Sequence, residues 1–304
     1  MFRGTMVAIV TPFKNEGKEV DEGKIAELVE FHIRSKTSAL VPCGTTGESP
    51  TLSLEEHERV VEVVVGAAKK RIPVVAGTGS NDTAVAIRLT KHAQEVGADG
   101  ALVVSPYYNR PSQEGLYRHF RAVAEGTSLP IILYNIQSRT GVNIEPETIA
   151  RLAKDCKNIV GVKEASGSLD QMSMIKLLCG PDFNLISGDD SLTLPLLAVG
   201  GVGVISVAAN LVPYDVQKMI DEFERGNIKA ATEQHYKLLP LVKAMFIETN
   251  PVPVKTAMAL LGMIEPGLRL PLCEMKKENE EKLRKVVLAH DEGKLRVGYW
   301  KGGD

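Results

Sequence analysis

The sequence predicts an α/β protein, a (β/α)8 or TIM barrel with a C-terminal all-helical extension. Eight short apolar runs alternate with longer amphipathic segments up to about residue 210, after which only helical patterns follow. Strands that alternate with helices form right-handed βαβ units and a parallel sheet, and eight such units close most simply into a barrel. An open doubly wound sheet is the alternative, but no Gly-x-Gly-x-x-Gly motif follows the first run.

Short apolar runs bounded by turn residues mark the strands. The eight expected strands are residues 6–10, 39–43, 72–76, 101–105, 131–134, 159–163, 184–187 and 204–207. Ile25, Leu28 and Ile33 follow helical spacing after the first strand. Ser53 with Glu56 three residues later is typical of a capping box that begins a helix.

The end of the strand pattern suggests where the chain divides. Four helical patterns follow the last strand, at residues 213–225, 228–247, 252–262 and 274–290. We expect a barrel domain over residues 1–224 and a helical domain over residues 225–304.

Composition excludes several classes of function. The net charge of this 304-residue chain is −2, so it has no basic field that would attract nucleic acid or an anionic membrane. No apolar run reaches the ~18 residues that span a bilayer, and the N-terminus does not read as a signal peptide. We therefore expect a cytoplasmic protein. The four cysteines are widely spaced without a Cys-x-x-Cys pair, which argues against zinc.

In a barrel, the functional site lies at the carboxyl ends of the strands. Lys163 ends the sixth expected strand, where Ile159 and Gly161 share its face and Val160 and Val162 occupy the other. Lysine is rarely buried, so one reading is a solvated strand end. The other is a nucleophile that forms a Schiff base with a carbonyl substrate.

A tyrosine supports the second reading of Lys163. Tyr134 occupies the equivalent position on the preceding strand, and neighbouring strands lie about 4.8 Å apart. If both side chains point inward, the phenol can shuttle a proton during imine formation. Glu164, the next residue, points to the other face and cannot hold the charge of the amine.

Three further strand ends carry polar or aromatic residues. Residues 44–48 place two hydroxyls between two glycines, so that backbone N–H groups and hydroxyls can approach an anion closely. The alternative is an ordinary glycine-rich turn. Tyr107 and Tyr108 lie in a proline-bounded loop, where interface packing is the usual role. The segment 188–190 ends in Asp189 and Asp190, whose negative charge would repel phosphate. We therefore expect a small carboxylate substrate.

A metal site is not expected. Each histidine falls in a helical segment and not at a strand end: His32, His57, His92, His119, His235 and His290. Asp190 is expected to cap a helix that begins at Ser191 and not to bind a metal ion.

Five motifs together resemble a known family. They are GTTGE (44–48), PYYNRP (106–111), YN (134–135) with SRTG (138–141), GVKEA (161–165) and SGDD (187–190). In order and spacing they resemble the dihydrodipicolinate synthases, within the superfamily of Schiff-base aldolases similar to N-acetylneuraminate lyase. The resemblance extends from residue 1 to about residue 271. The Thr45-Thr46 pair, Tyr108 and Arg139 distinguish this family from sugar-acid aldolases.

The resemblance implies a reaction that needs no external cofactor. Family members condense pyruvate with L-aspartate 4-semialdehyde, and the position of Lys163 forms the imine with pyruvate. Tyr134, Thr45 and Tyr108 correspond to a proton relay in which Tyr108 comes from a neighbouring subunit. A homotetramer, a dimer of dimers, is the implied assembly.

The resemblance also implies the substrate contacts. Thr46 and the backbone of Ile205 correspond to the pyruvate carboxylate site, and Gly188 belongs with the substrate-binding residues. Arg139 corresponds to the residue that meets the carboxylate of the second substrate. Two alternatives are a pyruvate-dependent aldolase or lyase acting on a 2-keto-3-deoxy sugar acid or N-acetylneuraminate, and a non-catalytic keto-acid sensor.

One departure from the family pattern predicts weak or absent feedback inhibition by lysine. Inhibited members bind lysine near the positions of Ser49, Pro50, Leu54, His57, Asn81, Val85 and Tyr107. They carry histidine at the position of Leu54 and, at that of Val85, a glutamate that pairs with the amine of lysine. Valine cannot supply that charge, and an unpaired buried ammonium costs roughly several kcal/mol. Half-maximal inhibition of activity at sub-millimolar lysine would contradict this prediction.

Overall fold

The expected barrel is confirmed in the computed structural model, which describes residues 2–290. Eight parallel strands form one sheet: β1 (Gly4–Ala8), β4 (Ala39–Val41), β5 (Val75–Gly77), β6 (Gly100–Val104), β7 (Ile131–Asn135), β8 (Ile159–Glu164), β9 (Asn184–Ser187) and β10 (Gly203–Ser206). Each overlaps an expected run, with shifts at the ends. The sheet order is β4-β1-β10-β9-β8-β7-β6-β5, and a parallel bridge between Leu40 and Val74 joins its two edges.

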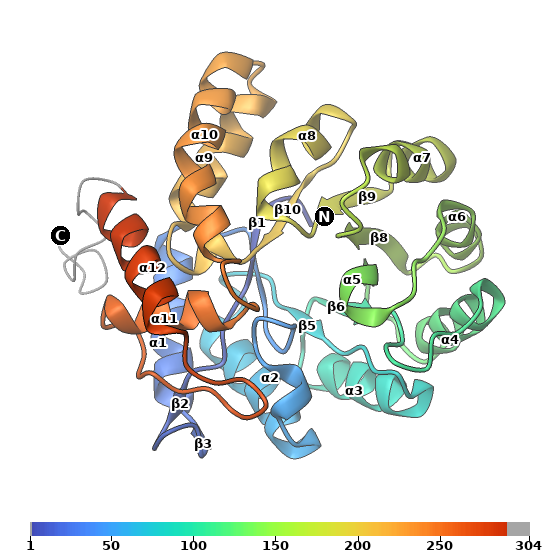
Figure 1. Ribbon diagram of the computed structural model, residues 1–304. Helices are drawn as coiled ribbons and strands as arrows, with labels where there is room; N and C mark the ends of the chain where they lie inside the picture. Colours follow the sequence, from blue (N-terminus) through green and yellow to red (C-terminus); the bar gives the residue numbers. More distant parts are fainter. Residues whose placement is uncertain (1, 291–304) are drawn as a thin grey trace.

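The connecting helices surround the strands (Figure 1). They are α1 (Glu22–Arg34), α2 (Leu54–Ala68), α3 (Thr83–Glu95), α4 (Gln113–Glu125), α6 (Pro146–Asp155), α7 (Leu169–Cys179), α8 (Thr193–Ala198) and α9 (Pro213–Glu224), with the short α5 (Gln137–Thr140) after β7. The capping box is confirmed, because Ser53 and Glu56 exchange hydrogen bonds at the start of α2. Short 3-10 helices are Ser49–Thr51, Asp190–Leu192 and Ala208–Asn210.

A small hairpin was not predicted. Strands β2 (Phe13–Lys14) and β3 (Glu19–Val20) pair antiparallel, separate from the barrel sheet. Two residues are too few to show an alternating pattern, so nothing in the local sequence distinguishes them from a loop.

The face assignment on β8 was wrong in part. The register skips one residue, because Ile131 pairs with Ile159 and Ile132 pairs with Gly161. Ile159 and Val162 therefore both belong to the core under the helices, while Val160 packs against the core inside the barrel. A β-bulge of this kind changes which residues share a face. Beyond the bulge, Lys163 pairs with Tyr134 in the register that the sequence predicted.

The C-terminal helices are found where the pattern placed them. α10 (Ile228–Ala244) packs along α9, and α12 (Lys277–Ala289) packs against α10 and α11 (Val252–Leu260), outside the ring of barrel helices (Figure 1). The domain boundary at residue 224 stays a prediction, and residues 291–304 lie outside the described part of the chain. Within residues 2–290, none of the helices has the length and apolar character needed to cross a bilayer.

Candidate active site

Lys163 and Tyr134 lie in contact at the carboxyl ends of two adjacent strands. The two residues are register partners on β8 and β7. The side chain of Lys163 is buried, with 6% of the residue exposed, so the reading as a solvated strand end was wrong. Its Nζ lies 4.1 Å from the centroid of the Tyr134 ring. The amine is therefore held against an aromatic ring in a buried position at the rim of the barrel.

Gly188 makes room for this lysine. A Cβ atom at Gly188 would lie 3.2 Å from Cε of Lys163 and 2.7 Å from Cβ of Ala165. The second distance is shorter than real Cβ contacts, so any larger residue would displace the segment that carries the amine. The glycine of the SGDD motif thus has a packing role beside Lys163.

Glu164 lies on the opposite face, as predicted, and is fully buried. Its carboxylate accepts hydrogen bonds from the backbone N–H of Ser166 at 2.7 Å and from the side-chain amides of Gln171 at 3.1 Å and Asn135 at 3.0 Å. All three donors are neutral. This network ties the end of β8 to β7 and α7, and so fixes the backbone next to Lys163.

A cavity of about 480 Å³ opens beside Tyr134, and Lys163 is not among the residues that line it. Thr45 from the loop after β4, Tyr134 from β7 and Arg139 from α5 contribute to its wall. The same cavity extends to several positions of the expected lysine site, namely Ser49, Pro50, Leu54, His57, Val85 and Tyr107. Burial lowers the pKa of His57 to about 4, so this imidazole is neutral at neutral pH.

Asn250, which the sequence analysis missed, reaches this region from the segment between α10 and α11. Its side-chain Nδ2 donates a hydrogen bond to Oγ1 of Thr46 at 3.1 Å. Its backbone carbonyl accepts one from Nη2 of Arg139 at 3.0 Å. Thr46 is buried, whereas Arg139 is largely exposed. No local pattern could reveal this contact, because Asn250 and Thr46 lie 204 residues apart.

Glu48, at the end of the GTTGE motif, forms a buried ion pair with Lys255 of α11. Nζ of Lys255 lies 2.5 Å from Oε1 of Glu48 and also donates to the backbone carbonyl of Thr11 at 3.0 Å. Burial lowers the pKa of Lys255, while the carboxylate of Glu48 opposes that shift. Removing one partner of such a pair typically costs about 3–5 kcal/mol of stability. The motif glutamate therefore anchors the loop that carries Thr45 and Thr46.

Tyr108 does not join the site within one chain. It is 90% exposed with a positive φ of 71°, whereas Tyr107 lines the cavity. Ile205 is buried on β10, beside Met6 of β1. The structure thus places Tyr134 and Gly188 next to Lys163 and puts Thr45 and Arg139 on the cavity wall. It leaves Tyr108 facing outward.

The prediction that Asp190 caps a helix was wrong. Asp189 is the cap, because its carboxylate accepts hydrogen bonds from the backbone N–H and hydroxyl of Ser191, each at 2.8 Å. Asp190 is instead buried, and its carboxylate accepts from the hydroxyl of Ser206 and, at 2.9 Å, from the N–H of Val207. Burial raises the pKa of Asp190.

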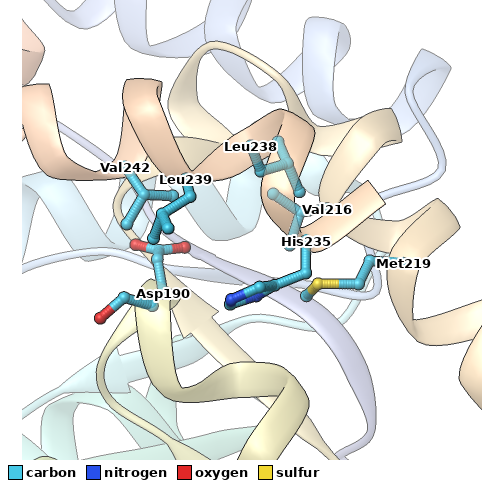
Figure 2. Close-up of a pocket in the computed structure, with 8 residues that line it drawn as sticks. Asp190, Val216, Met219, His235, Leu238, Leu239 and Val242 are labelled. Atoms are coloured by element: carbon cyan, nitrogen blue, oxygen red, sulfur yellow. The ribbon is translucent and has the colours of Figure 1, made fainter. Parts of the chain in front are cut away.

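The small pocket beside Asp190 is not a substrate site. Figure 2 shows Asp190 facing His235 and the apolar side chains of α9 and α10. The volume of about 10 Å³ holds at most one water molecule. Among the described residues, no group of three or more His, Cys, Asp or Glu side chains is arranged to hold a metal ion.

Comparison with known proteins identifies the family of this chain. Residues 1–290 match the model of the dihydrodipicolinate synthetase family. The 4-hydroxy-tetrahydrodipicolinate synthase of Syntrophus aciditrophicus is 60% identical over 287 residues, covering 94% of this chain and 98% of that protein. The corresponding enzyme of Endomicrobium trichonymphae is 57% identical over the same shares of both chains.

Solved structures give the same result. Dihydrodipicolinate synthase from Aquifex aeolicus superposes with a TM-score of 0.93 at 54% identity, covering 94% of this chain and 97% of that one. The 4-hydroxy-tetrahydrodipicolinate synthase of Methylacidiphilum fumariolicum gives a TM-score of 0.95 at 49% identity over 99% of both chains. The chain therefore belongs to the dihydrodipicolinate synthetase family.

Proposed function

We propose that this protein is a 4-hydroxy-tetrahydrodipicolinate synthase, a class I lyase that condenses pyruvate with L-aspartate 4-semialdehyde. This reaction is the first committed step of lysine biosynthesis through diaminopimelate. The observation that carries the proposal is the buried amine of Lys163 against Tyr134, at the carboxyl ends of adjacent barrel strands. Close relatives that share most of the chain carry this activity in their names.

The chemistry begins at the amine of Lys163. The neutral amine attacks the ketone carbon of pyruvate, and loss of water gives a protonated imine. This imine withdraws electrons, so the methyl carbon loses a proton and becomes an enamine. Tyr134 carries protons between the amine, the departing water and solvent, with Thr45 and a partner's tyrosine at position 108 completing the relay.

Carbon–carbon bond formation follows at the enamine. The enamine carbon attacks the aldehyde of aspartate semialdehyde, which regenerates the imine on Lys163. The amino group of the bound substrate then attacks the imine carbon, closes the six-membered ring and displaces the lysine amine. Lys163 returns to its initial state, so the cycle consumes no cofactor.

Three groups hold the substrate carboxylates in this proposal. The hydroxyl of Thr46 and the backbone at Ile205, beside Gly188, bind the carboxylate of pyruvate. The guanidinium of Arg139 binds the carboxylate of the second substrate, since its planar fork fits a carboxylate through two hydrogen bonds. The exposure of Arg139 fits a role for the substrate that enters second.

We also propose a homotetramer built as a dimer of dimers. The exposed ring of Tyr108, in a loop next to the cavity, suits insertion into the site of a neighbouring subunit. A second apolar surface on α7 would provide the other contact, and its exposed side chains are Leu169, Met174, Leu177 and Leu178. The cytoplasmic location expected from the sequence stays a prediction.

The proposed reaction is tested by offering pyruvate with one of two second substrates. We expect turnover with L-aspartate 4-semialdehyde and none in the cleavage of a 2-keto-3-deoxy sugar acid, measured by product formation. The Lys163→Met variant keeps the length of the side chain but not the nucleophile, so kcat should fall by about a thousandfold or more. Turnover of the sugar acid alone, or undiminished activity of Lys163→Met, would reject the synthase assignment.

The role of Tyr108 across an interface predicts complementation between two defective chains. Tyr108→Phe removes the hydroxyl and should lower kcat by about a hundredfold, in the range of a lost proton-transfer group. In a one-to-one mixture with Lys163→Met, half of the random dimers contain one site with both groups intact. Co-expression should then restore about one quarter of wild-type activity. A mixture no more active than the average of the two variants would place Tyr108 outside the partner's site.

A further inference from the structure

Asn250 contacts two residues that bind different substrates in the proposed reaction. It is 5% exposed and lies between α10 and α11, far in sequence from the loops of the barrel. Its side chain bonds Thr46, while its backbone carbonyl bonds Arg139. The remaining polar atom, Oδ1, is buried without a hydrogen-bond partner among the described residues.

We propose that Asn250 is a positioning residue that aims the hydroxyl of Thr46 at the carboxylate of pyruvate and pre-orders Arg139 for the second substrate. The inference deepens the proposed function and rests on it. It also gives the C-terminal segment a part in substrate binding.

The direction of the hydrogen bond to Thr46 carries the first half of the argument. A hydroxyl has a single proton to donate and can also accept. Because Nδ2 of Asn250 donates to Oγ1 of Thr46, the proton of that hydroxyl is left for another acceptor. A bound carboxylate is such an acceptor, and hydrogen bonds to charged groups are the stronger ones. The opposite amide orientation would draw the hydroxyl proton toward Asn250.

The unpartnered Oδ1 leaves one more position for a donor beside Thr46. A buried acceptor without a donor typically costs about 1–3 kcal/mol, so such atoms are few in native proteins and often mark functional positions. In a substrate site, this acceptor can be filled by an ordered water molecule or by a donor on the bound substrate. The side chain of Asn250 can therefore hold Thr46 through Nδ2 and accept a further hydrogen bond through Oδ1.

Arg139 provides the second half. A free arginine side chain loses up to about 2 kcal/mol of conformational entropy when it is ordered. The bond from Nη2 to the carbonyl of Asn250 fixes one corner of the guanidinium while other N–H groups stay available to a carboxylate. This bond uses the backbone, so substitutions of the Asn250 side chain leave the acceptor in place and isolate the effect on Thr46.

The test measures the pyruvate concentration that half-saturates imine formation, trapped by cyanoborohydride, together with the steady-state KM of each substrate. Asn250→Ala should raise the half-saturating pyruvate concentration and the KM of pyruvate (together, the pyruvate values) about tenfold. This is the loss expected for one hydrogen bond to a charged group. The KM of aspartate semialdehyde should change less than about twofold. Asn250→Asp should raise the pyruvate values further, because an ionised carboxylate only accepts hydrogen bonds and repels the carboxylate of pyruvate.

Coupling to Thr46 separates positioning from a merely structural role. Thr46→Val should raise the pyruvate values by itself, and adding Asn250→Ala should raise them no further. The matched control is Asn184→Ala, which removes another buried amide, one that donates to the carbonyl of Val160 at 3.1 Å. This control should leave the pyruvate values unchanged.

The outcomes separate this inference from the proposed function. Unchanged pyruvate values in Asn250→Ala, or effects of Asn250→Ala and Thr46→Val that add fully, would overturn the positioning role. A wild-type protein that traps pyruvate but does not condense it with aspartate semialdehyde would refute the synthase assignment alone. A wild-type protein that traps no pyruvate would refute both.

Discussion

The site is organised around one lysine side chain, Lys163, that is buried at the end of a parallel strand. Parallel strands place their carboxyl ends at one rim, so Lys163 on β8 and Tyr134 on β7 become neighbours through backbone register alone. Gly188, in the loop after β9, leaves space for the lysine side chain. The donors that bind Glu164 are all neutral, so they hold the end of β8 without placing another charged side chain beside the amine. The amine is thus presented next to a phenol that can exchange protons with it during imine formation.

The C-terminal helices complete this rim. The ion pair between Glu48 and Lys255 and the hydrogen bond between Thr46 and Asn250 both join the loop after β4 to the region of α11. That loop holds Cys43 and Glu48 at positive φ, conformations that are costly for residues other than glycine. The helical extension therefore stabilises a strained loop at the site and is more than a covering layer.

The sequence predicted the features that depend on a repeating pattern or on neighbouring residues in the chain. Strands, helices and the capping box follow from periodicity, and Lys163 and Tyr134 follow from their places at strand ends. Asn250 and Lys255 could not be predicted, because their partners lie 204 and 207 residues away and no pattern joins them. The bulge at Val160 escaped for a different reason, since strand alternation assumes a regular register. Tyr108 faces outward, so its proposed role requires the site of a second subunit, which a single chain cannot show.

The central claim is that Lys163 is the amine that reacts with pyruvate. Borohydride reduction in the presence of pyruvate converts the imine to a stable secondary amine, and peptide mass mapping locates it. We predict a single modified peptide that contains Lys163, with the adduct absent when pyruvate is omitted. An adduct on another lysine, such as the buried Lys255, or no adduct at all, would contradict the account.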